Sequence, residues 1–173
     1  MNLPNKLTIL RIVLILPFLL VLYLDIPFAD YIALVIFVAA SLTDLMDGKI
    51  ARRRGLVTDF GKFADPLADK MLVTAAMLWF VECGQMPGWV LFAVLLREFA
   101  VSGLRMVASD KGRVIAAGMS GKVKTASTMT CIILMFLPIP RLLNILCVAV
   151  ILVTTVWSGV EYFIKNRDCL TDM

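Results

Sequence analysis

Apolar residues form six long runs along the chain, separated by short polar stretches. Crossing the ~30 Å hydrocarbon core of a bilayer takes about 20 helical residues at ~1.5 Å each, and each run has roughly that length. Proline marks three of the connections, at Pro27, Pro87 and the pair Pro138 and Pro140. The six predicted helices span Leu7–Leu24, Tyr31–Arg52, Lys62–Cys83, Gly88–Ser109, Gly121–Leu137 and Leu142–Ile164. The pattern predicts an all-α, polytopic membrane protein built as a bundle of six transmembrane helices.

Composition agrees with a membrane protein. Of the 173 residues, 61% are hydrophobic, and the mean hydropathy is +0.92. A soluble domain of this length is normally about half apolar. The length suits one compact bundle, so we expect a single domain over residues 1–173.

The distribution of positive charge predicts the orientation of the bundle. Lysine and arginine gather at both termini, after the second apolar run, and between the fourth and fifth runs. The other three connections contain a single cation, Arg141. Cationic connections prefer the cytoplasmic side of a membrane. We therefore expect both termini in the cytoplasm and a multi-pass protein of the plasma membrane.

Two residue types limit the possible chemistry. The chain has no histidine, which excludes histidine bases and histidine metal ligands. Its four cysteines lie far apart and lack metal-ligand spacing. Acid–base or metal chemistry must therefore depend on carboxylates, lysine, arginine, tyrosine or the backbone.

Four aspartates lie where a membrane protein would ordinarily avoid charge. Asp44 and Asp47 precede the cytoplasmic end of the second run, and Asp65 and Asp69 follow the start of the third. The spacings i, i+3 and i, i+4 place each pair on one helix face. Intramembrane carboxylates cost several kcal/mol and commonly mark a functional site. Protonation, nearby cations or bound metal could compensate them.

The arrangement favours metal over a hairpin held by salt bridges. Nearby cations could balance the charge, but charge balance alone does not require each acidic pair to share a face. Gly48, next to Asp47, lowers helix stability by about 1 kcal/mol relative to alanine. Because glycine has no side chain, it leaves the helix backbone open to a ligand at this position. Oxygen ligands suit Mg²⁺ or Mn²⁺. Four carboxylates predict two ions, a geometry used for phosphoryl displacement.

The acidic pairs belong to a longer pattern, Asp-x2-Asp-Gly-x2-Ala-Arg-x8-Gly-x3-Asp-x3-Asp, which runs from Asp44 to Asp69. The pattern resembles the motif of the CDP-alcohol phosphotransferases and matches it without departure. Members of this family are six-helix membrane enzymes, many of them homodimers. They transfer a phosphatidyl or similar group from a CDP-linked donor to an alcohol and release CMP.

The resemblance implies roles for individual residues. Asp44, Asp47 and Asp65 correspond to metal ligands, and Asp69 to a further ligand that is also the proposed base for the attacking hydroxyl. The positions expected to face the cytidine diphosphate are Gly48, Ala51, Arg52 and, more loosely, Gly61. Asn5, Thr8 and Arg11 recur near one helix face and are candidates for the nucleotide pocket. Alternatively, Asn5 helps to start the first helix.

Four further stretches indicate the acceptor. They are "NLPNKLTILR", "LLREFAVSGLR", "GKVKT" and "SGVEYF", and they resemble the branch of the family that uses CDP-diacylglycerol as donor and sn-glycerol 3-phosphate as acceptor. A phosphorylated acceptor needs cations, for which Arg105, Lys122 and Lys124 are the candidates. Their alternative role is snorkelling toward anionic lipid. Arg97 lies deeper and either contacts the acceptor phosphate or pairs with Glu98 or a backbone carbonyl.

Other functions remain open at this point. Within the family, the acceptor could be inositol phosphate, serine or phosphatidylglycerol. From a different class, a divalent-cation transporter would also need intramembrane carboxylates. A conduction path should place polar groups in the outer half of the bundle, which is almost purely apolar here, with Thr74 and Thr154 among the exceptions. This favours an enzyme open to the cytoplasm. A scaffold subunit would give no reason for the acidic spacing.

Overall fold

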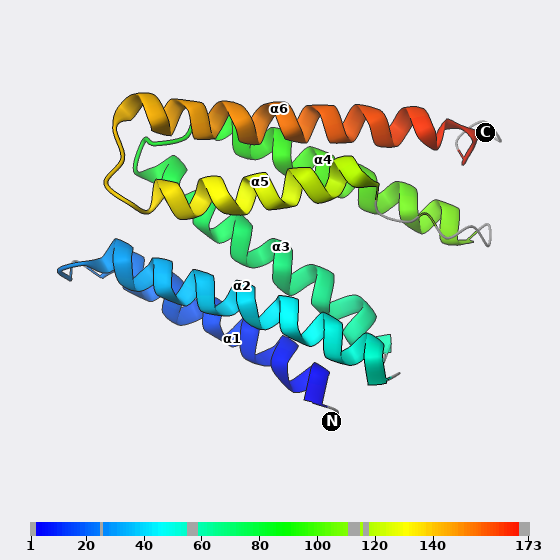
Figure 1. Cartoon of the computed structure of the whole chain (residues 1–173), viewed down its shortest axis with the longest axis horizontal. Coiled ribbons are helices and arrows are strands. Elements are labelled where there is room, and N and C mark those ends of the chain that lie inside the picture. The colour runs from blue at the N-terminus through cyan, green and yellow to red at the C-terminus, as the bar shows by residue number, and fades with distance from the viewer. Residues whose placement is uncertain (1–2, 25, 55–58, 111–114, 116–117, 170–173) are drawn as a thin grey trace. The chain divides into compact units, whose positions relative to one another are not determined.

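The computed structural model describes the backbone of residues 3–24, 26–54, 59–110, 115 and 118–169 (Figure 1). Within these ranges it describes all side chains except those of residues 3–8, 11, 44–54, 59–66, 69, 110 and 169. The described residues form six α-helices, one short 3-10 helix and no strand. The predicted all-α class and the number of helices are confirmed.

The helices begin and end within a few residues of the predicted bounds. They are α1 (Leu3–Tyr23), α2 (Ala29–Arg54), α3 (Asp59–Glu82), α4 (Gly88–Asp110), α5 (Met119–Met135) and α6 (Arg141–Lys165), followed by the 3-10 helix η1 (Arg167–Cys169). The largest difference is at the start of α1, which includes Pro4 in its first turn. Proline is tolerated there because the first amide groups of a helix have no intrahelical acceptor.

A glycine ends α3 and sets the turn into α4. Gly84 has a φ of 70°, which glycine adopts without steric cost. The amide of Gly84 donates to the carbonyl of Val81 at 3.1 Å, and the amide of Gln85 donates to that of Phe80 at 2.8 Å. These two bonds form a Schellman motif, which satisfies the last carbonyls of the helix. Pro87 then precedes the start of α4.

The chain divides into two compact units, Met1–Trp79 and Phe80–Met173, with the division inside α3. In the first unit α1 packs along α2. Phe18 and Phe37 are fully buried, with ring centroids 6.3 Å apart. Ala33 and Ala40 are also fully buried, one helical heptad apart, and their small side chains let α1 approach closely.

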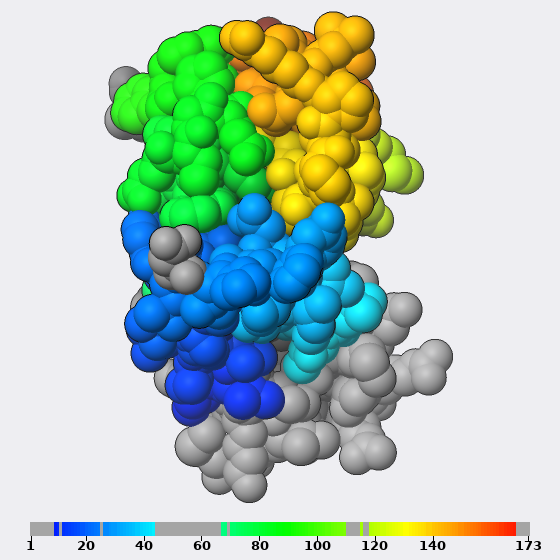
Figure 2. Space-filling view, turned by 90° about the vertical axis from the view of Figure 1, so that its left-hand side faces the viewer, coloured from blue at the N-terminus to red at the C-terminus, as the bar shows by residue number. Residues whose placement is uncertain are grey.

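In the second unit α6 packs against both α5 and α4. Cys131 and Ile132 of α5 and Cys147 and Ile151 of α6 are buried. Figure 2 shows the yellow and orange atoms of α5 and α6 meeting without a visible gap. Because α6 contacts both neighbours, polar side chains of α4 and α5 that turn toward it are gathered into one region.

Candidate active site

The predicted carboxylate ligands lie on two consecutive helices of the first unit. Asp44 and Asp47 belong to α2, and Asp65 and Asp69 belong to α3. The backbone is helical at all four positions, which confirms the spacing on which the shared faces depend. The side chains of these aspartates lie outside the described residues. So do those of the predicted nucleotide-site residues, namely Asn5, Thr8, Gly48, Ala51, Arg52 and Gly61.

The helix bounds place the two acidic pairs at similar distances from the end of α2 and from the start of α3. Asp44 lies ten residues before the end of α2, and Asp69 lies ten residues after the start of α3, about 15 Å along each axis. Asp47 and Asp65 lie seven and six residues from the same ends, about 10 Å. Residues 55–58 lie between the two helices in the sequence. Asp44 and Asp69 thus lie at equal distances from the ends of their own helices that border this segment, and Asp47 and Asp65 lie at similar distances.

The described side chains form no alternative metal site. Among them, no group of three or more histidine, cysteine, aspartate and glutamate residues is close enough to hold an ion. The described cysteines Cys83, Cys131 and Cys147 are free. The four aspartates of α2 and α3 therefore remain the candidates for metal binding.

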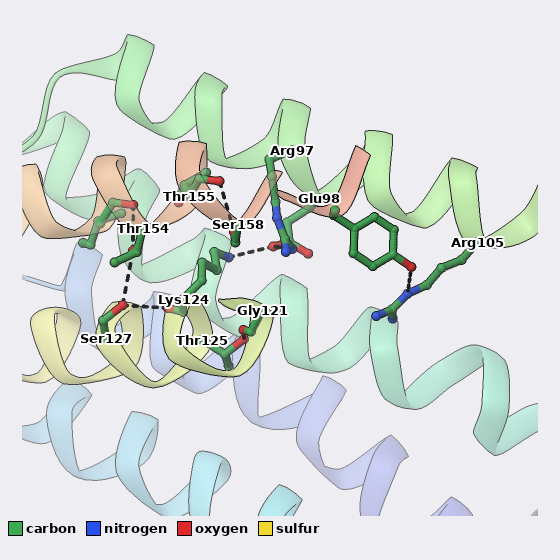
Figure 3. A network of polar contacts seen from close by, with 12 residues as sticks. Arg97, Glu98, Arg105, Gly121, Lys124, Thr125, Ser127, Thr154, Thr155 and Ser158 are labelled. Carbon is green, nitrogen blue, oxygen red and sulfur yellow. Dashed lines mark hydrogen bonds and ion pairs between the residues drawn. The ribbon is translucent and has the colours of Figure 1, made fainter. Parts of the chain in front are cut away.

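Arg105, predicted to contact the acceptor, is held by a neutral partner. Its Nε donates to the hydroxyl of Tyr162 at 2.8 Å, from α4 to α6 (Figure 3). The guanidinium carbon lies 5.4 Å from the centroid of the same ring. Arg105 is exposed, whereas Tyr162 is 7% exposed. The partner of Arg105 is thus a hydroxyl group rather than a carboxylate.

Lys124, by contrast, belongs to a buried ion cluster, defined here as Arg97, Glu98 and Lys124. The Nζ of Lys124 donates to Oε1 of Glu98 at 2.6 Å, and Nη1 of Arg97 donates to the same oxygen at 3.0 Å (Figure 3). The side chains of Lys124, Arg97 and Glu98 are 7%, 13% and 17% exposed. The cluster joins α4 to α5.

Arg97 packs closely against one glycine and lies beside a second. A methyl group at Gly159 of α6 would lie 3.2 Å from Cγ of Arg97, and one at Gly121 of α5 would lie 3.6 Å from its Nη2. The contact at Gly159 is tight, so Arg97 would have to move by a few tenths of an ångström to accept a methyl group there, whereas the contact at Gly121 is an ordinary van der Waals distance.

Replacing two glycines by alanine, one at a time, should distinguish the effect of close packing on stability from the effect of helix propensity. Gly103→Ala on α4 meets no atom within 4 Å, so it should raise the free energy of unfolding by about 1 kcal/mol. Gly159→Ala gains the same propensity but crowds Arg97, at a typical cost of about 1–3 kcal/mol. Thermal unfolding in detergent should show a higher midpoint for Gly103→Ala and a lower one for Gly159→Ala. Equal shifts would contradict the tight contact.

The cationic residues predicted from sequence take different positions. Lys122 is exposed, whereas Lys124 is buried and paired with Glu98. Arg97 pairs with Glu98, as the sequence allowed. Arg105 lies eight residues after Arg97, about 12 Å along α4. Arg105 and the buried ion cluster are therefore separate groups within the second unit.

Two residues make contacts with the candidate cations that the sequence did not predict. Tyr162, within the stretch "SGVEYF", orients Arg105 across 57 residues of sequence. Glu98 binds two cations, whereas the sequence suggested a pairing with Arg97 alone. A carboxylate inside an apolar run was the available signal for Glu98. Tyr162 gave no such signal, because a tyrosine at the end of an apolar helix is common.

The family model described as CDP-alcohol phosphatidyltransferase matches residues 1–157. The chain belongs to this family. It is 41% identical to a protein of Bacillus subtilis named CDP-diacylglycerol–glycerol-3-phosphate 3-phosphatidyltransferase, over 98% of this chain and 97% of that protein. It is 36% identical to a protein of Escherichia coli K12 with the same name, over 99% and 98%.

Membership of the CDP-alcohol phosphatidyltransferases makes the chain a phosphotransferase of phospholipid synthesis. The match covers all the residues of the acidic motif, from Asp44 to Asp69. The family assignment made from that motif is confirmed. Both relatives align with this chain over nearly their full length.

Proposed function

We propose that this enzyme transfers the phosphatidyl group of CDP-diacylglycerol to sn-glycerol 3-phosphate, giving phosphatidylglycerol phosphate and CMP. The main support is its near-complete alignment with relatives named for that reaction, at 41% and 36% identity. The four stretches that suggested a glycerol 3-phosphate acceptor provide a second line of support.

The reaction has a simple balance of bonds. The free primary hydroxyl of glycerol 3-phosphate attacks the phosphorus bonded to diacylglycerol. A new phosphorus–oxygen bond forms, and the bond from that phosphorus to the oxygen bridging it to the cytidine monophosphate unit breaks. CMP leaves with the bonding pair. Asp69 is proposed to take the hydroxyl proton, because a base positioned beside the nucleophile raises its reactivity.

The residues present fit divalent cations. Asp44, Asp47, Asp65 and Asp69 provide only carboxylate oxygens, the ligand type preferred by Mg²⁺ and Mn²⁺. Each pair lies within about 15 Å of the helix end that borders residues 55–58, a placement that suits a site shared between α2 and α3. When bound, two such ions would polarise the donor phosphate and neutralise charge on the leaving CMP. The negative pyrophosphate and the acidic residues could otherwise not share one site.

The remaining residues of the motif are proposed to bind the nucleotide. Gly48 and Gly61 would let the cytidine diphosphate approach the backbone of α2 and α3. Arg52 would provide positive charge for its phosphates, with Ala51 beside it. Asn5 and Thr8 of α1 are proposed to complete the pocket.

We place this enzyme in the plasma membrane as a six-helix, multi-pass, single-domain homodimer whose active site faces the cytoplasm. In the described part of the chain, α6 is the one helix long and apolar enough to cross a membrane. Large apolar side chains nevertheless cover much of the surface, including Phe99 of α4 (72% exposed) and Leu142 of α6 (70%). Such exposure is costly in water and natural in lipid.

A CMP-release assay with purified protein tests the proposal. CDP-diacylglycerol is supplied with one acceptor at a time: glycerol 3-phosphate, glycerol, inositol phosphate, serine or phosphatidylglycerol. We expect rapid release with glycerol 3-phosphate alone, and phosphatidylglycerol phosphate as the lipid product. Faster release with another acceptor would overturn the substrate assignment while leaving the family unchanged.

Arg105→Ala should weaken binding of the acceptor and spare the donor. A charge-assisted hydrogen bond to phosphate contributes about 1.5–3 kcal/mol, so the KM for glycerol 3-phosphate should rise about tenfold or more. The KM for CDP-diacylglycerol should stay within about twofold. Lys122→Ala and Lys124→Ala test the other two predicted contacts in the same way.

Arg141→Ala is the matched control. Arg141 is an exposed cation at the start of α6, and Tyr162, the partner of Arg105, lies near the other end of that helix. It should change neither constant. Snorkelling residues would instead give small, equal changes that vary with anionic lipid content. If none of the three substitutions changed the KM for glycerol 3-phosphate, the acceptor contacts would be wrongly assigned.

A further inference from the structure

The buried ion cluster contains two cationic side chains and one carboxylate. A single carboxylate oxygen, Oε1 of Glu98, accepts hydrogen bonds from both Lys124 and Arg97, at 2.6 and 3.0 Å (Figure 3). All three side chains are at least four-fifths buried. These three side chains carry two positive charges and one negative charge, in a place where water contributes little screening.

The cluster also contains N–H groups that have no acceptor among the described residues. A lysine ammonium carries three N–H groups, and Glu98 is the one hydrogen-bond partner of Lys124 Nζ among the described residues. In the same part of the chain, the buried Nε of Arg97 has no partner. Buried donors normally find acceptors. The excess charge and the unused donors both point to an anion that joins the cluster during function.

A purely structural ion pair does not explain these features. A buried ion pair stabilises a protein little compared with apolar residues of similar volume. One cation would suffice to balance Glu98, and Arg97 beside it already does so. Lys124 of α5 adds a second buried cation with its own cost of desolvation. Keeping Lys124 charged and in place therefore requires a reason beyond stability.

We propose that Glu98 is a positioning residue for the acceptor: it holds the Lys124 ammonium, from across the α4–α5 interface, where a phosphate monoester can receive its free N–H groups. This rests on the proposed function, in which the acceptor carries such a phosphate. Glu98 itself does not touch the substrate. Its carboxylate supplies the counter-charge that keeps the buried ammonium in one orientation until the phosphate arrives.

Glu98→Gln isolates this role. The substitution preserves the size of the side chain and an oxygen acceptor, but it removes the charge that attracts Lys124. We expect the KM for glycerol 3-phosphate to rise about tenfold, whereas the KM for CDP-diacylglycerol stays within about twofold. Glu98→Asp retains the charge on a shorter side chain and should recover part of the loss.

A binding measurement gives the same information without turnover. Glycerol 3-phosphate should raise the melting temperature of the wild-type protein in detergent, because a ligand that binds the folded state stabilises it. Glu98→Gln should need about tenfold more ligand for the same rise. Inorganic phosphate, which lacks the attacking hydroxyl, should show the same difference between the two proteins.

A double substitution shows whether Glu98 acts through Lys124. In a Lys124→Met background, Glu98→Gln should have no further effect on the KM for the acceptor, because its partner is already gone. Independent contributions would multiply instead. Asp168→Asn is the control, since Asp168 is an exposed carboxylate of η1 near a cation, Arg167. It should leave both KM values unchanged.

Several outcomes would overturn the proposal. One is a folded Glu98→Gln protein whose acceptor KM is unchanged, which would mean that Glu98 does not affect the acceptor, or lower, which would mean that Glu98 repels it. Another is a Glu98→Gln effect that persists in full without Lys124. A wild-type protein that releases no CMP with glycerol 3-phosphate would instead refute the proposed function. If Glu98→Gln does not fold, a folded Lys124→Met protein with an unchanged acceptor KM decides against the positioning role, because Glu98 is proposed to act through Lys124.

Discussion

Asp47→Asn should lower the rate of CMP release by a factor of at least about 10³ while the helices remain folded. Asn retains the size of the side chain but loses the charge that a divalent cation requires. Charge stabilisation by a bound metal is worth several kcal/mol in a transition state, and each 1.36 kcal/mol corresponds to a factor of ten in rate. Initial rates at saturating substrates, with circular dichroism to confirm helicity, measure the effect.

Asp30→Asn provides the control, because Asp30 is an exposed aspartate at the start of the same helix, α2. It should keep full activity. EDTA should abolish the activity of the wild-type protein, and added Mg²⁺ or Mn²⁺ should restore it. Near-normal turnover by a well-folded Asp47→Asn protein would refute the proposed metal site, whatever the response to EDTA.

Asp69→Asn should separate binding from chemistry. Proton transfer by a positioned base typically contributes about 10²–10⁴ in rate. If Asp69 takes the proton of the attacking hydroxyl, the Asn protein should bind CDP-diacylglycerol nearly as well as wild type but lose about that factor in kcat. Equilibrium binding of the donor, measured together with single-turnover CMP release, gives the two quantities independently.

The ligand role of Asp69 predicts a different pattern. A lost ligand would weaken donor binding along with turnover, as expected for Asp44→Asn, which serves as the comparison. Loss of donor binding with no further loss of rate at saturating donor would remove Asp69 from the role of base. It would then belong to the metal ligands alone.

The sequence predicted the helices well because their lengths and ends have local causes. Apolar runs of about 20 residues fix the number of helices. Pro87, Pro138 and Pro140 lie where continued helix is unfavourable, and Gly84 provides the left-handed residue that ends α3. The acidic spacing could likewise be read directly, since it depends only on the period of the helix.

The surroundings of the cations could not be predicted in the same way. Lys122 and Lys124 look equivalent in the stretch "GKVKT", yet two residues of helix turn them to different faces. Lys124 is buried against Glu98 and Lys122 is exposed, because α5 is rotated to present position 124 to α4. That rotation depends on packing among three helices. The partnership of Arg105 with Tyr162 depends on the same packing.

The passage of Arg97 beside Gly159 also links α4 and α6 in their tolerance of substitution. A methyl group at position 159 would lie 3.2 Å from Cγ of Arg97, so Arg97 must move further as the residue at position 159 grows. Replacing Arg97 by a small residue would remove this contact, and alanine or serine at position 159 should then be tolerated.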